Sequence, residues 1–347
     1  MSSSTFRLAT ALRHGRTKID DVYFEAPFKL MTPFTNGRHS DFIVMFASPG
    51  FLQGDEAHID IDFGPGSDAT ITTQSYEKVL NTAEGSASRT IDLRAQGDAK
   101  SVFLPFPVIP FRNSTFTNVT TAHIAAESTF IYADVVTCGR VGMDERWAMR
   151  RFTNRLRVYV AESAAVTQAL RNQTEAERAS AHRRGRPPKR DEPQLHEHLA
   201  FADRMLLEPD AFDYTNLGMW REFTHCGVIY VHLPELDTAA AQDAAMGAAE
   251  SNTAANNAKS ALDLDGVPAN ASASASPDSI RARIESTRIA AEDDLISRIR
   301  SHADAVGFVG ELGVSRVVNG LCVRLLTTRG DNTFDFIKDI VDIVTGS

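Results

Sequence analysis

The sequence predicts a mainly β protein, built from stacked β-layers in a solenoid-like, two-sheet architecture with about two α-helices. The first observation is a period of two, because Ile59, Ile61 and Phe63 alternate with polar residues. This pattern is typical of a strand with one buried face and one solvated face. The second is a Gly-Pro-Gly turn at residues 64–66, followed by the β-branched run at residues 69–73.

The third observation is a repeat of this arrangement along the chain. Asp68, Asp98 and Ser128 each mark a turn between an alternating strand and a more apolar strand. Their spacing of about 30 residues lies in the range of stacked supersecondary units. One two-strand layer cannot bury its own apolar face, so neighbouring layers must stack. An ordinary β-sandwich with evenly spaced hairpins is the alternative.

Taken in order, the chain begins with residues 1–20, for which we predict a flexible N-terminus. Residues 21–347 are predicted to form a single domain with two insertions. The first, at about 169–194, is strongly charged and contains a Pro-Pro pair, so we expect a solvated loop between two strands of a hairpin. The second, at about 238–277, is dominated by Ala, Ser, Asn and Asp and is predicted to be disordered.

The remaining elements follow from local patterns. Asp278 and Ser279 offer an N-cap to an amphipathic helix that extends to about His302, and an apolar stripe predicts a terminal helix. Proline interrupts two predicted β segments, the opening one at residues 22–34 and another at 104–111. Both should therefore lie at the border of a sheet. The other predicted elements are an opening strand pair at 22–34, strands at 152–160, 199–207 and 227–231, two strands within 308–327, and the terminal helix at 334–344.

The composition limits the possible partners and compartments. The 347 residues are 43% hydrophobic and carry a formal net charge of −9, which argues against nucleic acid or an anionic membrane as a partner. Cys138, Cys226 and Cys322 are odd in number and far apart, so a disulfide framework is not expected and the cytoplasm is the predicted location. We expect neither a signal peptide nor a membrane-spanning helix.

Common catalytic motifs do not occur in the sequence. It lacks a nucleophile elbow, a P-loop, a dinucleotide glycine fingerprint, a CxxC pair and an HExxH helix. What remains is a set of carboxylates, thiols and imidazoles close to turns. They could line a catalytic carboxylate pair, act as weak metal ligands, or be solvated turn residues. These residues are Asp55, His58, Asp60, Asp134, Cys138, Asp144, Glu145, His225 and Cys226.

Six motifs in order resemble the family of urease accessory proteins called UreD, or UreH. They include the turn SPGFLQGD at 48–55, the segment TTQSYEKV at 72–79 and the run DVVTCGRVGMDERW at 134–147. The others are the proline-rich stretch at 105–111, the Thr-His strand at 218–230 and the closing strand at 314–326. Gln53 and the Asp144-Glu145 pair depart from the family pattern.

The resemblance implies a maturation factor for the urease nickel centre that is not itself an enzyme. Family members form a complex with UreF and the GTPase UreG, dock on the urease structural subunits and help to deliver nickel. The implied fold is mostly β with two helices. No tightly bound cofactor is implied, because nickel is in transit, and neither nucleic acid nor a membrane is an expected partner.

The resemblance also implies an internal route for the metal, with Asp55, Asp134, Cys138 and Glu145 as candidates. Oxygen and sulfur ligands of this kind can hold nickel weakly enough to release it. For Asp55, a hydrogen bond to its own turn is an equal alternative. Two other functions stay open: a β-solenoid carbohydrate-active enzyme with paired carboxylates, and a β-rich interaction module without a metal role.

Overall fold

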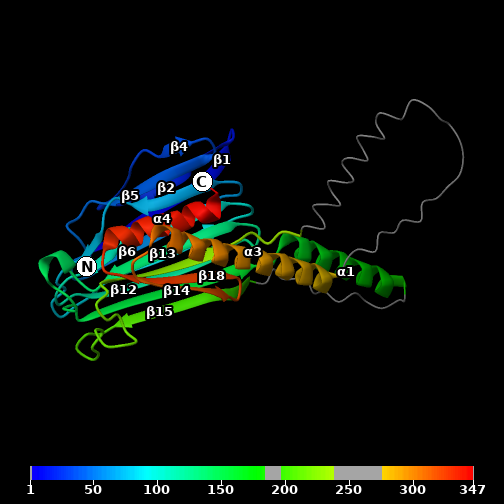
Figure 1. The fold of residues 1–347 in the computed structure, drawn as a ribbon. Helices are drawn as coiled ribbons and strands as arrows, with labels where there is room; N and C mark the ends of the chain where they lie inside the picture. Colours follow the sequence, from blue (N-terminus) through cyan, green and yellow to red (C-terminus); the bar gives the residue numbers. More distant parts are fainter. Residues whose placement is uncertain (1, 184–196, 238–275, 347) are drawn as a thin grey trace, which may run out of the picture. The chain divides into compact units, whose positions relative to one another are not determined.

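The computed structural model describes residues 2–183, 197–237 and 276–346, whose strands form two sheets (Figure 1). Sheet A has seven strands in the order β15 (Glu197–Leu207), β14 (Arg151–Ala161), β12 (Thr115–Ile124), β9 (Ala87–Ala95), β6 (Asp55–Phe63), β1 (Ser2–Arg13) and β2 (Arg16–Phe24). Sheet B has eleven strands. Its main path is β17 (Glu311–Val317), β18 (Gly320–Thr327), β16 (His225–His232), β13 (Thr129–Thr137), β10 (Lys100–Leu104), β7 (Asp68–Thr73), β5 (His39–Phe46) and β3 (Phe28–Leu30), with β4 (Phe34–Asn36), β8 (Glu77–Val79) and β11 (Val108–Pro110) beside it.

The predicted stacking of layers is confirmed. β6, β9 and β12 pair in parallel in sheet A, and β7, β10 and β13 pair in parallel in sheet B. The same tight turn joins the two strands of each layer, because Ser67, Ala99 and Ser128 each donate a backbone hydrogen bond to the carbonyl three residues earlier, at 3.1–3.2 Å. Hairpins would give antiparallel neighbours, so the alternative of an ordinary sandwich is wrong.

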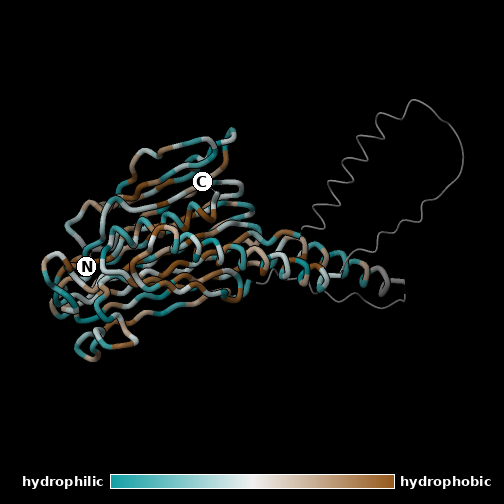
Figure 2. Tube along the Cα trace, in the orientation of Figure 1, coloured by the Kyte–Doolittle hydropathy of each residue, from teal (hydrophilic) through white to brown (hydrophobic). Residues whose placement is uncertain are grey.

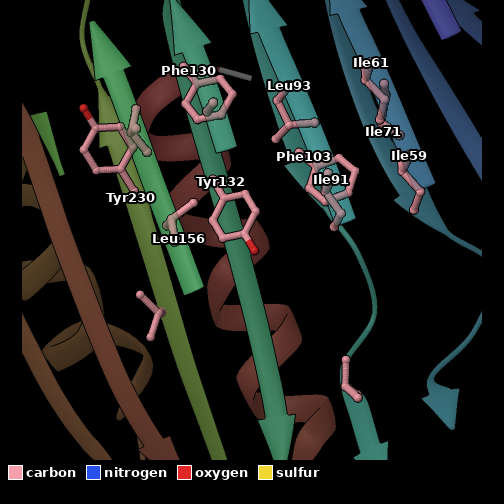
Figure 3. Close-up of a cluster of buried hydrophobic side chains, with 14 of the residues drawn as sticks. Ile59, Ile61, Ile71, Ile91, Leu93, Phe103, Phe130, Tyr132, Leu156 and Tyr230 are labelled. Carbon is pink, nitrogen blue, oxygen red and sulfur yellow. The ribbon is translucent and has the colours of Figure 1, made fainter. Parts of the chain in front are cut away.

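The main hydrophobic core lies between the two sheets. In sheet A, inward-facing side chains alternate along β9 and β12 with more exposed, mostly polar ones, and the colours of Figure 2 alternate accordingly. Because neighbouring layers are in register, side chains of the same kind stack over one another; Ile59, for example, pairs with Ile91. Figure 3 shows part of this core, with Ile59, Ile61, Ile71, Ile91, Leu93, Phe103, Phe130, Tyr132, Leu156 and Tyr230.

A second core covers the other face of sheet B. The C-terminal half of α3 (Pro277–Val306) and the whole of α4 (Gly330–Thr345) contribute Leu295, Ile299, Phe334, Ile337 and Ile340 to it. α4 packs on β13, β16 and β18, as the red helix in Figure 1 shows. The terminal helix and the helix near residue 280 were both predicted. None of the described helices is long and apolar enough to cross a membrane.

The backbone contacts divide the chain into two compact units. The first comprises residues 1–161, 197–234 and 291–347, and contains both sheets. The second comprises residues 162–196 and 235–290. Within this second unit, Val166 of α1 (Ala164–Arg183) packs with Ile280 and Ile284.

Two predictions about the chain ends and insertions are wrong. Residues 2–20 are not flexible, because β1 and β2 occupy them and β1 pairs in parallel with β6. The charged insertion is not a loop as far as Arg183, because α1 runs through it, and its Ala, Gln, Glu and Arg residues are strong helix formers. Residues 184–196 and 238–275, which hold the rest of this insertion and almost all of the predicted disordered one, lie outside the described residues.

The close contact between β1 and the turn after β6 provides a test of this packing. Gly64 donates a backbone hydrogen bond to the Thr10 carbonyl at 3.0 Å, and an added Cβ would lie 2.4 Å from that oxygen. We expect Gly64→Ala to lower the free energy of unfolding by about 1–3 kcal/mol, as overpacking does. Gly142→Ala is the control, because nothing lies within 4 Å of its added Cβ. Equal urea-denaturation midpoints for the two variants would contradict this packing.

Candidate functional site

Seven buried polar side chains lie between the two sheets, in what is otherwise an apolar core. They come from both sheets, from β8 and β13 on one side and β9, β12 and β14 on the other. We call them the inter-sheet network: Glu77, Arg89, Asn118, Thr120, Tyr132, Asp134 and Asn154. Polar groups that are removed from water need hydrogen-bond partners, so the bonds within this network determine what it can do.

Arg89 is the charged centre of the network. Its side chain is 1% exposed and forms an ion pair with Glu77, while Nε donates a hydrogen bond to Asn118 Oδ1 at 2.8 Å. Within the described residues its Nη2 has no hydrogen-bond partner. A buried guanidinium without a carboxylate beside it would be strongly destabilising, so Glu77 and Arg89 depend on each other.

Asp134 has one occupied and one free carboxylate oxygen. Oδ2 accepts hydrogen bonds from Asn154 Nδ2 at 2.9 Å, and from Asn118 Nδ2 and the Tyr132 hydroxyl at 3.2 Å each. Oδ1 is buried and has no hydrogen-bond partner in the part of the chain that the structure describes. Burial raises the pKa of Asp134, although the positive charge of Arg89 opposes this. The free oxygen can accept a hydrogen bond or bind a cation.

Cys226 lies one strand away from Asp134 on the same inward side. It pairs with Val136 of β13, two residues along from Asp134, and belongs to the core between the sheets. Burial raises the pKa of the Cys226 thiol to about 12, and the charge of Asp134 adds to this effect. The thiol is therefore protonated at neutral pH, and would lose its proton on binding a metal ion.

Cys138 is fully buried beside a loop at the end of β13. Its backbone N–H donates to the Thr224 carbonyl at 2.8 Å, and its carbonyl accepts from Trp147 N–H at 2.6 Å. Burial raises the pKa of this thiol to about 11. Its packing is that of a core residue, and its proposed metal role stays a prediction.

Glu145 holds the loop that follows β13. Arg140 binds it with two hydrogen bonds, Nε to Oε1 at 3.0 Å and Nη2 to Oε2 at 2.5 Å, and Arg112 N–H donates to Oε1 at 2.9 Å. The hydrogen bonds from Arg140 lower the pKa of Glu145. A metal ion would have to displace these donors. Glu145 could therefore act as a transient nickel ligand only if this loop rearranged.

Asp55 accepts a hydrogen bond from Leu52 N–H at 2.8 Å, so it closes its own turn, as the alternative interpretation expected. The structure thus places Asp55 at the first position of β6, Glu145 in a loop and Asp134 between the sheets, each with different partners. Among the described residues, no three His, Cys, Asp or Glu side chains come together as a group that could hold a metal ion.

Sequence analysis missed most of the inter-sheet network. Its signal is a polar residue at an inward position of an alternating strand, such as Arg89 between Ala87 and Ile91. The partners are separated by the layer repeat, 29 residues for Arg89 and Asn118 and 36 for Asn118 and Asn154. Polar residues that recur at this spacing would have pointed to the network.

The fold and the network together define a class: a two-sheet β-solenoid whose interior carries a bonded set of polar side chains. A sequence profile described as UreD urease accessory protein matches residues 2–346. The chain therefore belongs to the UreD family of urease accessory proteins.

Individual relatives are similar over part of their length. The urease accessory protein UreH of Helicobacter pylori strain HPAG1 is 34% identical over 157 residues, which cover 45% of this chain and 59% of the relative. UreH of strain G27 is 28% identical over 234 residues, 67% of this chain and 75% of the relative. UreD of Acetivibrio thermocellus is 32% identical over 148 residues, 42% of this chain and 56% of the relative.

The raised pKa of Asp134 predicts how two substitutions affect stability. A carboxyl group with a raised pKa in the folded state stabilises the fold below its unfolded value, about 3.8, and this stabilisation is lost as the pH rises through the folded pKa. The stability of Asp134→Asn relative to the natural chain should therefore increase with pH. Asp134→Ala leaves its hydrogen-bond donors unpaired and should cost about 1–3 kcal/mol. Urea denaturation at a series of pH values from about 3.5 to 8 measures both, and a difference for Asp134→Asn that stays constant over this whole range would contradict the assignment.

Proposed function

We propose that this chain is a maturation factor for urease, acting as a scaffold and nickel-transfer conduit between a UreF and UreG GTPase complex and apo-urease. The observation that carries the proposal is the family match, which extends over residues 2–346. UreF, UreG and the urease structural subunits are the proposed partners, and the cytoplasm is the proposed location. The relatives are themselves named urease accessory proteins.

The inter-sheet network supports the conduit part of the proposal. Asp134 offers an interior carboxylate oxygen that no described residue binds, and the Cys226 thiol lies on the neighbouring strand. Nickel accepts both oxygen and sulfur ligands, and a single carboxylate or thiol holds it weakly. Separate weak ligands suit an ion that must move on, whereas a closed set of ligands suits storage.

Glu77 links the network to the protein surface. The same side chain that pairs with Arg89 also lines a surface cavity of about 90 Å³, together with Tyr76 and Lys78. On its inner side it borders a second, smaller cavity of about 10 Å³ that is also lined by Arg89. A cation that entered at this cavity would meet Glu77 and its partner Arg89, and Asn118 connects Arg89 to the Asp134 carboxylate.

The alternative, a carbohydrate-active enzyme, would need two carboxyl groups in an open groove, one of them with a raised pKa. A cleft of about 450 Å³ beside α4 does contain Asp41 and Asp68. Both contact the same imidazole, since Asp68 lies 2.6 Å from His39 Nδ1 and Asp41 lies 3.2 Å from Nε2. Burial alone would raise the pKa of Asp68, but the hydrogen bond to His39 holds it below its usual value. A carboxyl group with a lowered pKa is a poor general acid, so these contacts are better explained as structural than as catalytic.

Replacing Asp134 tests the conduit directly. Asp134→Asn keeps an oxygen that can accept the hydrogen bonds from Asn118 and Asn154 but removes the charge that attracts a cation. We expect the nickel content of urease matured with this variant to fall about tenfold, while UreF and UreG still copurify with the chain.

Asp60→Asn is the matched control, because Asp60 carries the same charge but is partly exposed and pairs with Arg94 at 2.8 Å. It should support normal nickel loading. Normal loading with Asp134→Asn would show that nickel does not depend on this carboxylate, and loss of the complex would favour a purely scaffolding role.

A further inference from the structure

An ion pair joins the two sheets at the edge of sheet A that is formed by β15. Arg324 of β18 in sheet B binds Asp203 of β15, the terminal strand of sheet A. The Asp203 side chain is 8% exposed, whereas the Arg324 side chain is 52% exposed. The carboxylate is thus covered, and the guanidinium that covers it is in contact with solvent.

The row of inward-facing side chains on β15 is otherwise apolar. Phe201 and Leu207 are buried and Met205 is partly buried against the core. Phe201 stacks on Tyr230 of sheet B, with ring centroids 5.2 Å apart. These contacts keep the two sheets together at this edge, because exposing apolar side chains to water is unfavourable. An ion pair can exchange one partner for another ion, so the contact between Asp203 and Arg324 is the one in this row that can separate.

Two buried thiols lie close to this ion pair. Cys322 is two residues from Arg324 on β18, and Cys226 is on the adjacent strand β16, where its partner on β18 is Leu326. The charges of Arg324 and Asp203 act on both thiols, and Asp134 acts on Cys226 as well. β16 lies between β13, which carries Asp134, and β18, which carries Arg324, so Cys226 is on the strand between the interior carboxylate and the ion pair.

We propose that the Asp203 carboxylate is a binding site for a divalent transition-metal cation at this end of the inter-sheet space, and that Arg324 occupies the site when the cation is absent. The cation would exchange with the Arg324 guanidinium, which swings into solvent on its flexible stem. It would then lie within reach of Cys226, whose sulfur is a suitable ligand for nickel. This inference rests on the proposed function for the identity of the cargo.

Thiol labelling of the full-length chain tests the site without urease. N-ethylmaleimide modifies accessible cysteines, and peptide mass spectrometry reports each of the three separately. Cys138 is an internal reference, because it is fully buried and its thiol is influenced by Arg146 and not by this ion pair. The rates at Cys226 and Cys322 are compared with that at Cys138, with and without nickel ion.

Arg324→Gln should open the site and raise labelling at Cys226 and Cys322 about tenfold relative to Cys138. The charge of Arg324 lowers the pKa of both thiols, so its loss alone would slow their reaction, and a faster rate must come from access. Nickel ion should protect Cys226 in this variant. The double variant Asp203→Asn/Arg324→Gln should label as fast but lose the protection.

Arg221→Gln is the matched control, because Arg221 forms a surface ion pair with Glu311 elsewhere in the same unit. Labelling of Arg324→Gln no faster than that of this control would overturn the inference. Equal protection of Cys226 by nickel in the double variant would also overturn it. A faster labelling rate at Cys138 as well would overturn it too, because that would report general unfolding. No urease is present in this experiment, so a negative labelling result would not argue against the proposed function. Conversely, normal loading of urease without this chain would not change the labelling result.

Discussion

Parallel stacking of similar two-strand layers is the constraint on which the rest of this structure depends. The tight turns at Ser67, Ala99 and Ser128 repeat the same backbone hydrogen bond, and this fixes where each layer begins relative to the next. Side chains alternate between the two faces of a strand, so a slip of one residue would turn the whole inward row towards solvent. The register therefore determines which residues form the core and which polar residues are enclosed with it.

The inter-sheet network is a consequence of that register and has an energetic cost. Arg89, Glu77 and Asp134 lie in positions that apolar side chains occupy elsewhere in the same strands. A buried ion pair is often no more stabilising than well-packed apolar residues of the same volume. Stability alone thus gives little reason for these charges. The proposed role in passing an ion would give a physical reason, because Asp134 Oδ1 has no hydrogen-bond partner among the described residues.

Much of the fold could be predicted from the sequence, because period-two alternation and a turn every 30 residues or so are local signals. β1 was missed because the start of the chain is rich in Ser and Thr and gives a weak strand signal. The burial of Phe6 and Leu8 depends on pairing with β6, which is distant in the sequence. α1 was missed because charge was taken as a sign of a loop. Asp134 was named through the family resemblance, but Arg89 and Asn118 were not, since their contact depends on the register between layers.

The central claim is that this chain is needed to load urease with nickel, and the most direct measurement compares maturation with and without it. The cognate urease would be produced in cells together with UreF and UreG, and its nickel content and rate of urea hydrolysis measured in both cases. We expect both to collapse when the chain is absent and to return when it is restored. Unchanged loading without the chain would contradict the account, whatever the structure of its interior.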